Sequence, residues 1–483
     1  MVKRYQRIAA VLCVLLLAAE LAHTGLKEKL EEEEEVLVER PLLIWYTDPD
    51  IQDYMEAAAA ETASRYQVEV RAELVSEVDY IEKISEKSVE EEMAGPDLYV
   101  ASSAVLEKAV LAGLAEPVTD PGLFETYSEK AVHAVTYDGA AVARPFYIET
   151  CFMLYNRYYV DPEEVPQDIE GILTYAENFE SDASTERVEH IFKWNVADVI
   201  DNYMFLGAYT DLGGPDGDDK SQVTMDLEKA TECMTYYQSL NEFFAIDADT
   251  VTSEEVIQEF IDGKCVFTIV NVPMLAELDR AVAAGEIPEY PTERTVTGED
   301  GEEHTETVSY DPFYQIIPLP PLTDTLSSRG LSVTNSVVVN PYSSNVKAAE
   351  ACARYLTQER AGRLYEEARK LTACKSLLEA EMSKPDTSDT EASGSEWTGL
   401  VTGYQSLYDR LLGRSQEEAP EPDFSGKYVT VYEAYEAAAE VPKIMELSNM
   451  WLRLEVVLAD IWRGADAGEE MAGFKELLET QLD

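Results

Sequence analysis

The chain has 483 residues, which is long for one small domain and makes two domains the natural expectation. Its 37 basic and 95 acidic side chains give a formal net charge of −58, which argues against nucleic-acid binding, because phosphate contacts need clustered Lys and Arg. The same charge disfavours adsorption to anionic lipid, while 46% hydrophobic and 10% aromatic residues are ample for buried cores.

The amino terminus predicts transport out of the cytoplasm. Basic residues precede an apolar run over residues 8–22, which has the length of a signal-peptide core and is short for a membrane span. A clean small-x-small cleavage site is missing, and Cys13 lacks the preceding small residue of a lipoprotein signal. Residues 1–25 are therefore expected to be either a signal peptide or a membrane anchor. An acidic, solvated spacer over residues 26–40 follows.

Strands and helices are expected to alternate after the spacer, which predicts βαβ units and a parallel sheet. The expected elements are a strand at 42–46, a helix at 50–66, a strand at 68–75, a helix at 78–93, a strand at 97–100 and a helix at 104–112. Ligands of such sheets lie beyond the carboxyl ends of the strands.

Two loops at these strand ends carry candidate ligand-binding side chains. Asp48 follows the first strand, and Ser102 and Ser103 follow the third. Their oxygens can bond a ligand, but the same residue types also cap helix N-termini, and Pro49 suits a first helical position after Asp48. The sequence leaves both interpretations open.

The segment over residues 137–179 is the most informative part of the chain. A Tyr-Asp-Gly turn and a short strand lead to Phe146, Tyr147 and Glu149, and an apolar strand then closes on Tyr155 and Asn156. A loop containing two prolines leads from there into a helix. This order resembles the first crossover between the lobes of extracellular solute-binding proteins of the maltose-binding type.

The resemblance extends over roughly residues 41–483. Residues 96–114 resemble the family's Pro-Asp, strand, small polar loop, helix, Ala-Gly-Leu element. Residues 263–274 resemble its Gly-Lys strand followed by Pro-Trp, with Met274 in place of the tryptophan. Residues 442–462 resemble its terminal loop and the helix behind it.

This resemblance implies an α/β fold of the type-II periplasmic-binding-protein class, with two lobes, a hinge and an interlobe cleft. Crossovers between the lobes are expected near residues 146–150, 311–318 and 370–380. The implied domains are a first lobe over 41–148 and 314–375, and a second lobe over 149–313 and 376–483, with a mobile loop at 383–396.

The function implied is that of an extracytoplasmic binding protein that captures a small solute, most plausibly a carbohydrate. Closure of the hinge then delivers the solute to the permease of an ABC importer. A monomer without cofactor or catalytic activity is expected. Two alternatives stay open: a ligand-sensing partner of a membrane receptor kinase, and an envelope glycosidase using two carboxylates such as Glu149 and Asp48.

Glu149 is the leading candidate for ligand contact. A carboxylate at a crossover can accept hydrogen bonds from hydroxyl or ammonium groups, while the ring of Phe146 covers an apolar face of the ligand. The alternative for Glu149 is an interlobe salt bridge or a hinge cap.

Residues of the expected second lobe complete the candidate set. By resemblance, Trp451 stacks on the apolar face of a sugar, although its apolar neighbours also suit a core tryptophan. Trp194 and Asn202 belong to a stretch whose counterpart supplies an aromatic residue to the cleft. Asn271 ends the strand of the Gly-Lys element.

Other features favour structural roles. Ala101, Ala104 and Val105 stand where maltose binders place Trp-x-x-Asp-Arg, so maltose itself is a poor candidate ligand. The acidic loop over residues 210–220 is expected to be a solvated turn, because it lacks the ligand spacing of a calcium loop. The five cysteines after Cys13 are expected to be mostly buried, with one bridged pair not excluded.

Overall fold

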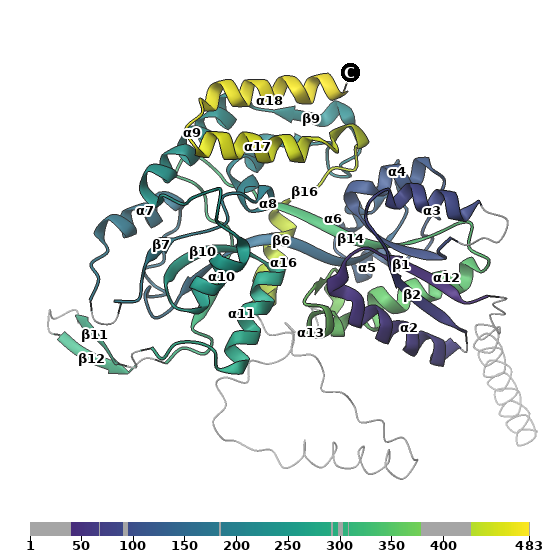
Figure 1. Cartoon of the computed structure of the whole chain (residues 1–483), viewed down its shortest axis with the longest axis horizontal. Helices are drawn as coiled ribbons and strands as arrows, with labels where there is room; N and C mark the ends of the chain where they lie inside the picture. The colour runs from purple at the N-terminus through teal and green to yellow at the C-terminus, as the bar shows by residue number, and fades with distance from the viewer. Residues whose placement is uncertain are drawn as a thin grey trace, which may run out of the picture.

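A computed structural model gives the arrangement of two lobes joined by one sheet that runs through both (Figure 1). The strand order in this sheet is β2-β1-β3-β14-β6-β10-β7, with β13 and β15 on β6 and β16 on β14. The expected leader at 1–25, most of the spacer and the loop at 383–396 lie outside the described residues. The structure describes residues 40–66, 68–89, 95–182, 185–290, 293–297, 303–307, 309–377 and 427–482.

The first lobe contains the predicted βαβ units. Strands β1, β2 and β3 are parallel, so the strand predicted at 42–46 is confirmed, and alternate residues of β1 are buried. The elements before the crossover are β1 (Leu42–Tyr46), η1 (Pro49–Ile51), α2 (Gln52–Tyr66), β2 (Val70–Leu74), α3 (Tyr80–Ser88), β3 (Leu98–Ser102), η2 (Ser103–Val105), α4 (Leu106–Leu111), α5 (Leu123–Thr126), α6 (Glu129–Ala134), β4 (Thr136–Tyr137) and β5 (Ala140–Ala141).

One 13-residue strand, β6 (Arg144–Asn156), connects the lobes. Its first half pairs with β14 (Leu331–Val339) and β15 (Leu371–Thr372), and its second half pairs with β10 (Cys265–Asn271) and β13 (Tyr314–Ile317). Every residue of β6 is buried except Glu149, which stays partly exposed. The crossover therefore aims a single polar side chain away from the packed strands.

The second lobe is mostly helical and holds the largest core. In Figure 1, α17 and α18 lie beside each other along one side of this lobe, next to α9. Its helices and strands up to residue 284 are α7 (Ile169–Asn178), β7 (His190–Phe192), α8 (Val199–Asn202), η3 (Tyr203–Phe205), η4 (Gly207–Tyr209), β8 (Thr210–Leu212), η5 (Lys220–Gln222), β9 (Val223–Met225), α9 (Leu227–Phe244), α10 (Ser253–Ile261), β10 and α11 (Val272–Ala284).

The remaining elements complete both lobes. Strands β11 and β12 pair with each other in an antiparallel arrangement. The elements after α11 are β11 (Glu293–Thr297), β12 (Glu303–Thr307), β13, β14, α12 (Val346–Arg354), the π-helical turn η6 (Tyr355–Glu359), η7 (Ala361–Arg363), α13 (Leu364–Ala368), β15, α16 (Lys427–Ala437), β16 (Ala439–Glu440), η9 (Met445–Leu447), α17 (Met450–Trp462) and α18 (Ala467–Leu482).

The second passage between the lobes differs from the expected boundary at residue 314. Strand β13 pairs with residues 153–156 of β6, so the chain is still in the second lobe there. The return follows along β14, which pairs with both β6 and β3. The physical reason is that Ile316 is buried in the second-lobe core rather than in the first.

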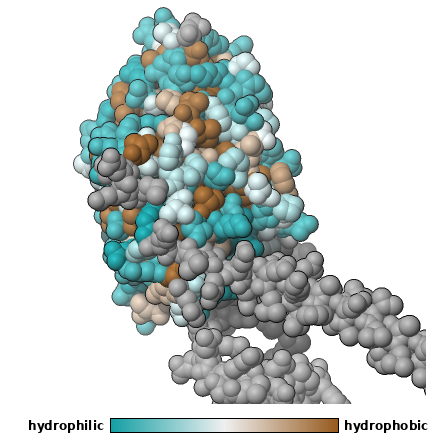
Figure 2. Space-filling model, turned by 90° about the vertical axis from the view of Figure 1, so that its right-hand side faces the viewer, coloured by the Kyte–Doolittle hydropathy of each residue, from teal (hydrophilic) through white to brown (hydrophobic). Residues whose placement is uncertain are grey.

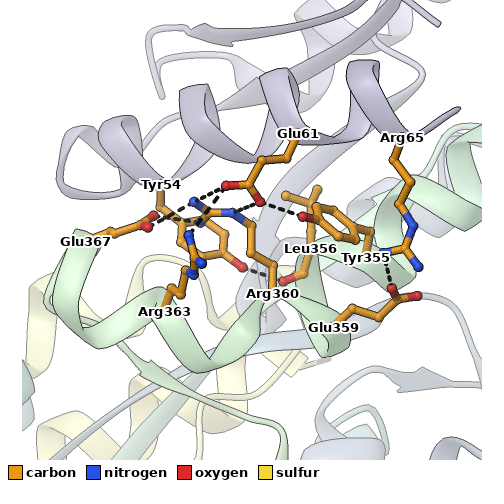
Figure 3. A network of polar contacts seen from close by, with 9 residues as sticks. All are labelled: Tyr54, Glu61, Arg65, Tyr355, Leu356, Glu359, Arg360, Arg363 and Glu367. Carbon is orange, nitrogen blue, oxygen red and sulfur yellow. Dashed lines mark hydrogen bonds and ion pairs between the residues drawn. The ribbon is translucent and has the colours of Figure 1, made fainter. Parts of the chain in front are cut away.

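The two separate pieces of the first lobe are joined by a buried arginine (Figure 3). The guanidinium of Arg360 donates to Glu61 on α2 at 2.9 Å and to Glu367 on α13 at 2.6 Å. It also lies 4.5 Å from the ring centre of Tyr54, whose hydroxyl donates to the Leu356 carbonyl at 2.7 Å. A charge-assisted network thus fastens residues 355–367 to the helix that follows β1.

The acidic loop expected to be a solvated turn instead contacts the elements before the crossover. The imidazole Nδ1 of His133 on α6 lies 2.5 Å from Oδ1 of Asp216, and the Asp138 amide donates to Oδ2 of Asp218 at 3.0 Å. Nearby, the buried Lys443 donates to the carbonyls of His133 and Ala134. Two stretches of the second lobe are therefore attached to α6 and its neighbouring turn.

The described residues also show the state of the cysteines and the character of one outer surface. The five cysteines after Cys13 are buried and free, so no bridged pair forms among them. Figure 2 shows that the outer end of the first lobe is mainly hydrophilic, with apolar residues in small separate groups. Within the described residues, no helix combines the length and apolar composition needed to cross a membrane.

Candidate functional site

A cavity of about 590 Å³ opens where the first lobe meets the crossover strands. Thr47 and Asp48 reach it from the carboxyl end of β1, and Ala101 and Ser102 reach it from the carboxyl end of β3. This is the position that ligands take in open α/β sheets. Glu149 of β6 closes the wall on the side of the second lobe's strands.

The base of the cavity is built around the ammonium group of Lys370. Its Nζ lies 3.0 Å from Oδ2 of Asp48 and 3.1 Å from Oε1 of Glu149. Tyr147 donates a 2.9 Å hydrogen bond to the same Asp48 oxygen, and its ring centre lies 5.5 Å from the ammonium. Four side chains from three separate stretches of the chain therefore form one charged cluster.

The electrostatics of this cluster keep Lys370 charged. Burial lowers the pKa of Lys370, but the Glu149 and Asp48 carboxylates outweigh this effect and raise the pKa above its usual value. Burial and the same two carboxylates raise the pKa of Tyr147 well above its usual value, so its hydroxyl stays a donor. Glu149 forms the salt bridge that was one of its two predicted roles, and its side chain also lines the cavity.

The two serines after β3 have different positions. Ser102 lines the cavity, and its side chain makes no capping hydrogen bond at the start of η2. Ser103 is fully buried and donates a 2.7 Å hydrogen bond to Oε1 of Glu440 on β16. Asp48 does cap η1 through the Asp50 amide, as its position before Pro49 predicts.

Three predicted site residues lie inside the cores instead of on the cavity. Phe146 is fully buried against Tyr54 and Tyr147, with ring centres 5.6 Å and 5.3 Å away. Trp194 and Asn202 are also fully buried, and the indole Nε1 donates to the Asn202 side-chain oxygen at 2.9 Å. In this arrangement none of the three offers a surface to a solute.

Trp451 and Asn271 lie in the second lobe, away from the cavity wall. Trp451 is half-buried on α17, and its ring centre is 5.9 Å from that of Tyr203. Asn271 caps α11 by accepting a 3.2 Å hydrogen bond from the Met274 amide. The residues that line the cavity come from the first lobe and the crossover segments.

The sequence prediction missed Lys370 and Asn335. Asn335 and Val333 are alternate residues of β14 and face the cavity, as a two-residue strand period requires. A signal for Lys370 was present, because the third crossover was expected to begin there. A single lysine among many acidic residues could not reveal its partners, which lie more than 200 positions earlier in the chain.

The cavity wall favours polar contacts over ring stacking. Its aromatic side chains, Tyr80 and Tyr147, are both buried, so neither presents a wide ring face. Ala101 and Val105, the residues at the positions where maltose binders are expected to carry larger side chains, both line it. The wall combines hydroxyl and amide groups with five carboxylates and two lysines.

Comparison with known proteins gives matches in sequence and in fold. The sequence model for bacterial extracellular solute-binding proteins matches residues 56–362. The maltotriose-binding protein of Pyrococcus abyssi (strain GE5 / Orsay) is 27% identical over 175 residues, which are 35% of this chain and 36% of that protein. The chain therefore matches only about a third of that relative's length.

Solved structures share the whole fold. A cyclo/maltodextrin-binding protein complexed with maltotetraose superposes with a TM-score of 0.64 and 16% identity, covering 92% of this chain and 98% of that chain. An extracellular solute-binding protein from Staphylococcus aureus in complex with maltose gives 0.62 and 14%, covering 92% and 98%. The two-lobed architecture predicted from the sequence is thereby confirmed.

Proposed function

We propose that this chain, which belongs to the family of bacterial extracellular solute-binding proteins, captures a small carbohydrate outside the cytoplasm. The observation that carries the proposal is the cavity at the carboxyl ends of β1 and β3, with the partly exposed carboxylate of Glu149 at its edge. Family and fold are those of binding proteins, so the solute is captured without being chemically changed.

The carbohydrate class is supported by the chemistry of the wall. Sugar hydroxyls both donate and accept hydrogen bonds, and the wall offers carboxylate acceptors together with the hydroxyl of Ser102 and the amide of Asn335. The Pyrococcus relative is named for maltotriose, and both structural neighbours hold glucose oligomers. Trp451 on α17 is proposed to add an aromatic face from the second lobe when the lobes close.

Closure is proposed to occur by bending of the strands that connect the lobes. Strands β6 and β14 run from one lobe to the other, and β15 pairs with β6 at the same level. A solute that touches both lobes binds the closed state more tightly and shifts the population toward it. The closed monomer then docks on an ABC permease, and residues 1–25 export or anchor the protein.

Thermal unfolding of the purified protein with a panel of mono- and oligosaccharides, polyols, amino acids and peptides tests this function. A ligand at a hundred times its dissociation constant adds about 2.7 kcal/mol to the stability of the native state, which is a readable shift. Glu149→Gln is expected to reduce the shift by at least half, whereas Glu476→Gln, a change to an exposed carboxylate on α18, keeps it. A panel in which only amino acids or peptides stabilise the protein contradicts the carbohydrate proposal.

A further inference from the structure

Lys370 joins three parts of the chain beneath the cavity. Its side chain is only 5% exposed, and it precedes β15 on the third passage between the lobes. Its Nζ contacts Asp48 and, at 3.4 Å, Asp50 in the loop after β1, as well as Glu149 on β6. Burying an ammonium group costs free energy, and the three carboxylates around Lys370 offset that cost only in this arrangement.

Both carboxylate oxygens of Asp48 already accept hydrogen bonds within the protein. Its Oδ1 accepts from the Asp50 amide at 2.9 Å, and its Oδ2 accepts from Tyr147 and from Lys370. Glu149 differs, because Lys370 contacts only its Oε1 and its side chain keeps 30% exposure on the cavity. Among the described residues Oε2 of Glu149 has no donor, so this oxygen is available to a solute.

Each of the two lysines in the cavity wall is paired with at least one carboxylate. Lys370 faces Asp48 and Glu149, and the other lysine of the wall, Lys108, lies 2.5 Å from Glu82. The carboxylates of Glu77 and Asp79 are exposed at the rim of the same cavity. A solute carrying a carboxylate or phosphate therefore meets repulsion and no unpaired lysine along this wall.

We propose that Lys370 is the positioning and specificity-determining residue of this site. It holds Glu149 as a charged acceptor for hydroxyl or ammonium groups. Because its own charge is balanced by Asp48 and Glu149, it offers no free positive charge to an anionic solute, and such solutes are excluded from the cavity. The inference rests on the proposed capture of a carbohydrate and narrows that class to neutral and amino sugars, to the exclusion of sugar acids.

Removal of the ammonium has a defined electrostatic consequence. Without Lys370, the carboxylates of Asp48 and Glu149 face each other across the space that it filled, and one of them binds a proton. The folded variant then holds more protons than its unfolded chain at mildly acidic pH, so its stability falls as pH rises. The titratable or charged groups around this point are Asp48, Asp50, Tyr147, Glu149, Glu77, Asp79, Glu82, Lys108 and Arg369.

The first test needs no ligand. Melting temperatures of the wild type, Lys370→Met, Lys370→Arg and the double variant Lys370→Met with Glu149→Gln are compared between about pH 5 and about pH 8. The deficit of Lys370→Met is expected to grow with pH, whereas the double variant and Lys370→Arg show a nearly constant difference from the wild type. A deficit of Lys370→Met that is equal at both pH values reflects lost packing alone and overturns the positioning role.

The second test compares three sugars that share one ring and differ in charge: neutral, positive and negative. Glucose, glucosamine and glucuronate are titrated against the wild type, Glu149→Gln and Lys370→Met at neutral pH. We expect the wild type to bind the first two and to reject glucuronate, and Glu149→Gln to bind about tenfold to a hundredfold more weakly. Lys370→Met, with its unbalanced carboxylates, is expected to prefer glucosamine to glucose.

The two tests distinguish failure of the Lys370 inference from failure of the proposed carbohydrate-binding function. Glucuronate binding as tight as glucose binding overturns the charge selection while leaving the carbohydrate function intact. If none of the three rings and no panel sugar binds, the carbohydrate function fails, and the pH series of the ligand-free protein still decides the positioning role of Lys370.

Discussion

Tyr365 donates a 2.8 Å hydrogen bond to Oδ2 of Asp279 and so joins α13 of the first lobe to α11 of the second. Two second-lobe hydroxyls also donate to this carboxylate, from Tyr314 on β13 and from Tyr428 on α16. Burial and the neighbouring Asp279 raise the pKa of Tyr365, so the hydroxyl stays protonated and keeps donating. This bond lies beside the crossover strands and restrains the lobes relative to each other.

Replacing Tyr365 by Phe is expected to loosen the connection between the lobes. The variant keeps the ring but loses the bond to a charged acceptor, which lowers the free energy of unfolding by about 1.5 kcal/mol. Urea unfolding gives the stability, and hydrogen exchange of the amides in α13 and β15 reports on local opening. Tyr314→Phe is the matched control, because it removes a bond to the same carboxylate between β13 and α11, both in the second lobe. Equal exchange rates in both variants contradict an interlobe role for Tyr365.

Replacing Arg360 by Met is expected to destabilise the first lobe by about 3 kcal/mol, because Glu61 and Glu367 lose their buried partner. The side chain of Arg360 is 2% exposed, whereas that of Arg363, which also approaches Glu61, is 43% exposed. Arg363→Met is therefore expected to cost less than 1 kcal/mol, on the order of a surface ion pair. Chemical denaturation of the two variants makes the comparison, and similar losses would falsify the assignment of Arg360 as the fastening residue.

Because of Lys443, the free energy of unfolding is expected to depend on pH in the alkaline range. Burial lowers the pKa of Lys443 to about 8, against the opposing effect of Glu440, while an unfolded lysine titrates near about 10.4. Between these values the unfolded chain binds the extra proton, so this lysine makes the native state more stable as pH rises. The stability of the wild type relative to Lys443→Met is expected to increase by roughly 2 kcal/mol from about pH 7.5 to about pH 9.5.

Urea unfolding of both proteins at the two pH values measures this increase. The half-exposed Lys229 on α9 supplies a control, because Lys229→Met changes a lysine that is open to solvent. The difference between the wild type and this control is expected to stay constant. A constant difference for Lys443→Met as well means that the ammonium is not desolvated in the native protein.

The two tryptophans of α17 are expected to respond differently to truncation. Trp462 is buried and donates from Nε1 to the Ile246 carbonyl at 2.9 Å, so Trp462→Ala costs about 3–5 kcal/mol. Trp451 is half-buried, and Trp451→Ala is expected to weaken sugar binding about tenfold with a much smaller loss of stability. Calorimetric titration and thermal unfolding of both variants check this. Unchanged binding in Trp451→Ala places that ring in the core alone.

The sequence predicted the architecture well because its signals are local. The apolar runs of β1 and β6 are properties of neighbouring residues, and the partly exposed Glu149 interrupts the run of β6. The prediction of Phe146 and Trp194 as cleft residues rested on aromatic residues near polar ones. That pattern is the same in a core and in a cleft, because burial depends on which distant segments cover the side chain.

The limits of the predicted site have the same origin. Lys370 acquires its role from Asp48 and Glu149, and the sequence carries no local record of either contact. The lobe boundary near residue 314 was displaced because β13 and β14 are both apolar strands that pair with β6. Only the partner of each strand tells which lobe it belongs to.

The return of β14 to the first lobe has a consequence for biosynthesis. β3 pairs with β14 along one edge, and the first-lobe core includes Val337, Leu356 and Leu364. A ribosome must therefore make more than three hundred residues before the first core is complete. Until then β3 has an open edge, which is prone to associate with other chains unless it is shielded. The first lobe thus completes its core late in synthesis, after most of the second lobe's strands and helices up to residue 284 have been made.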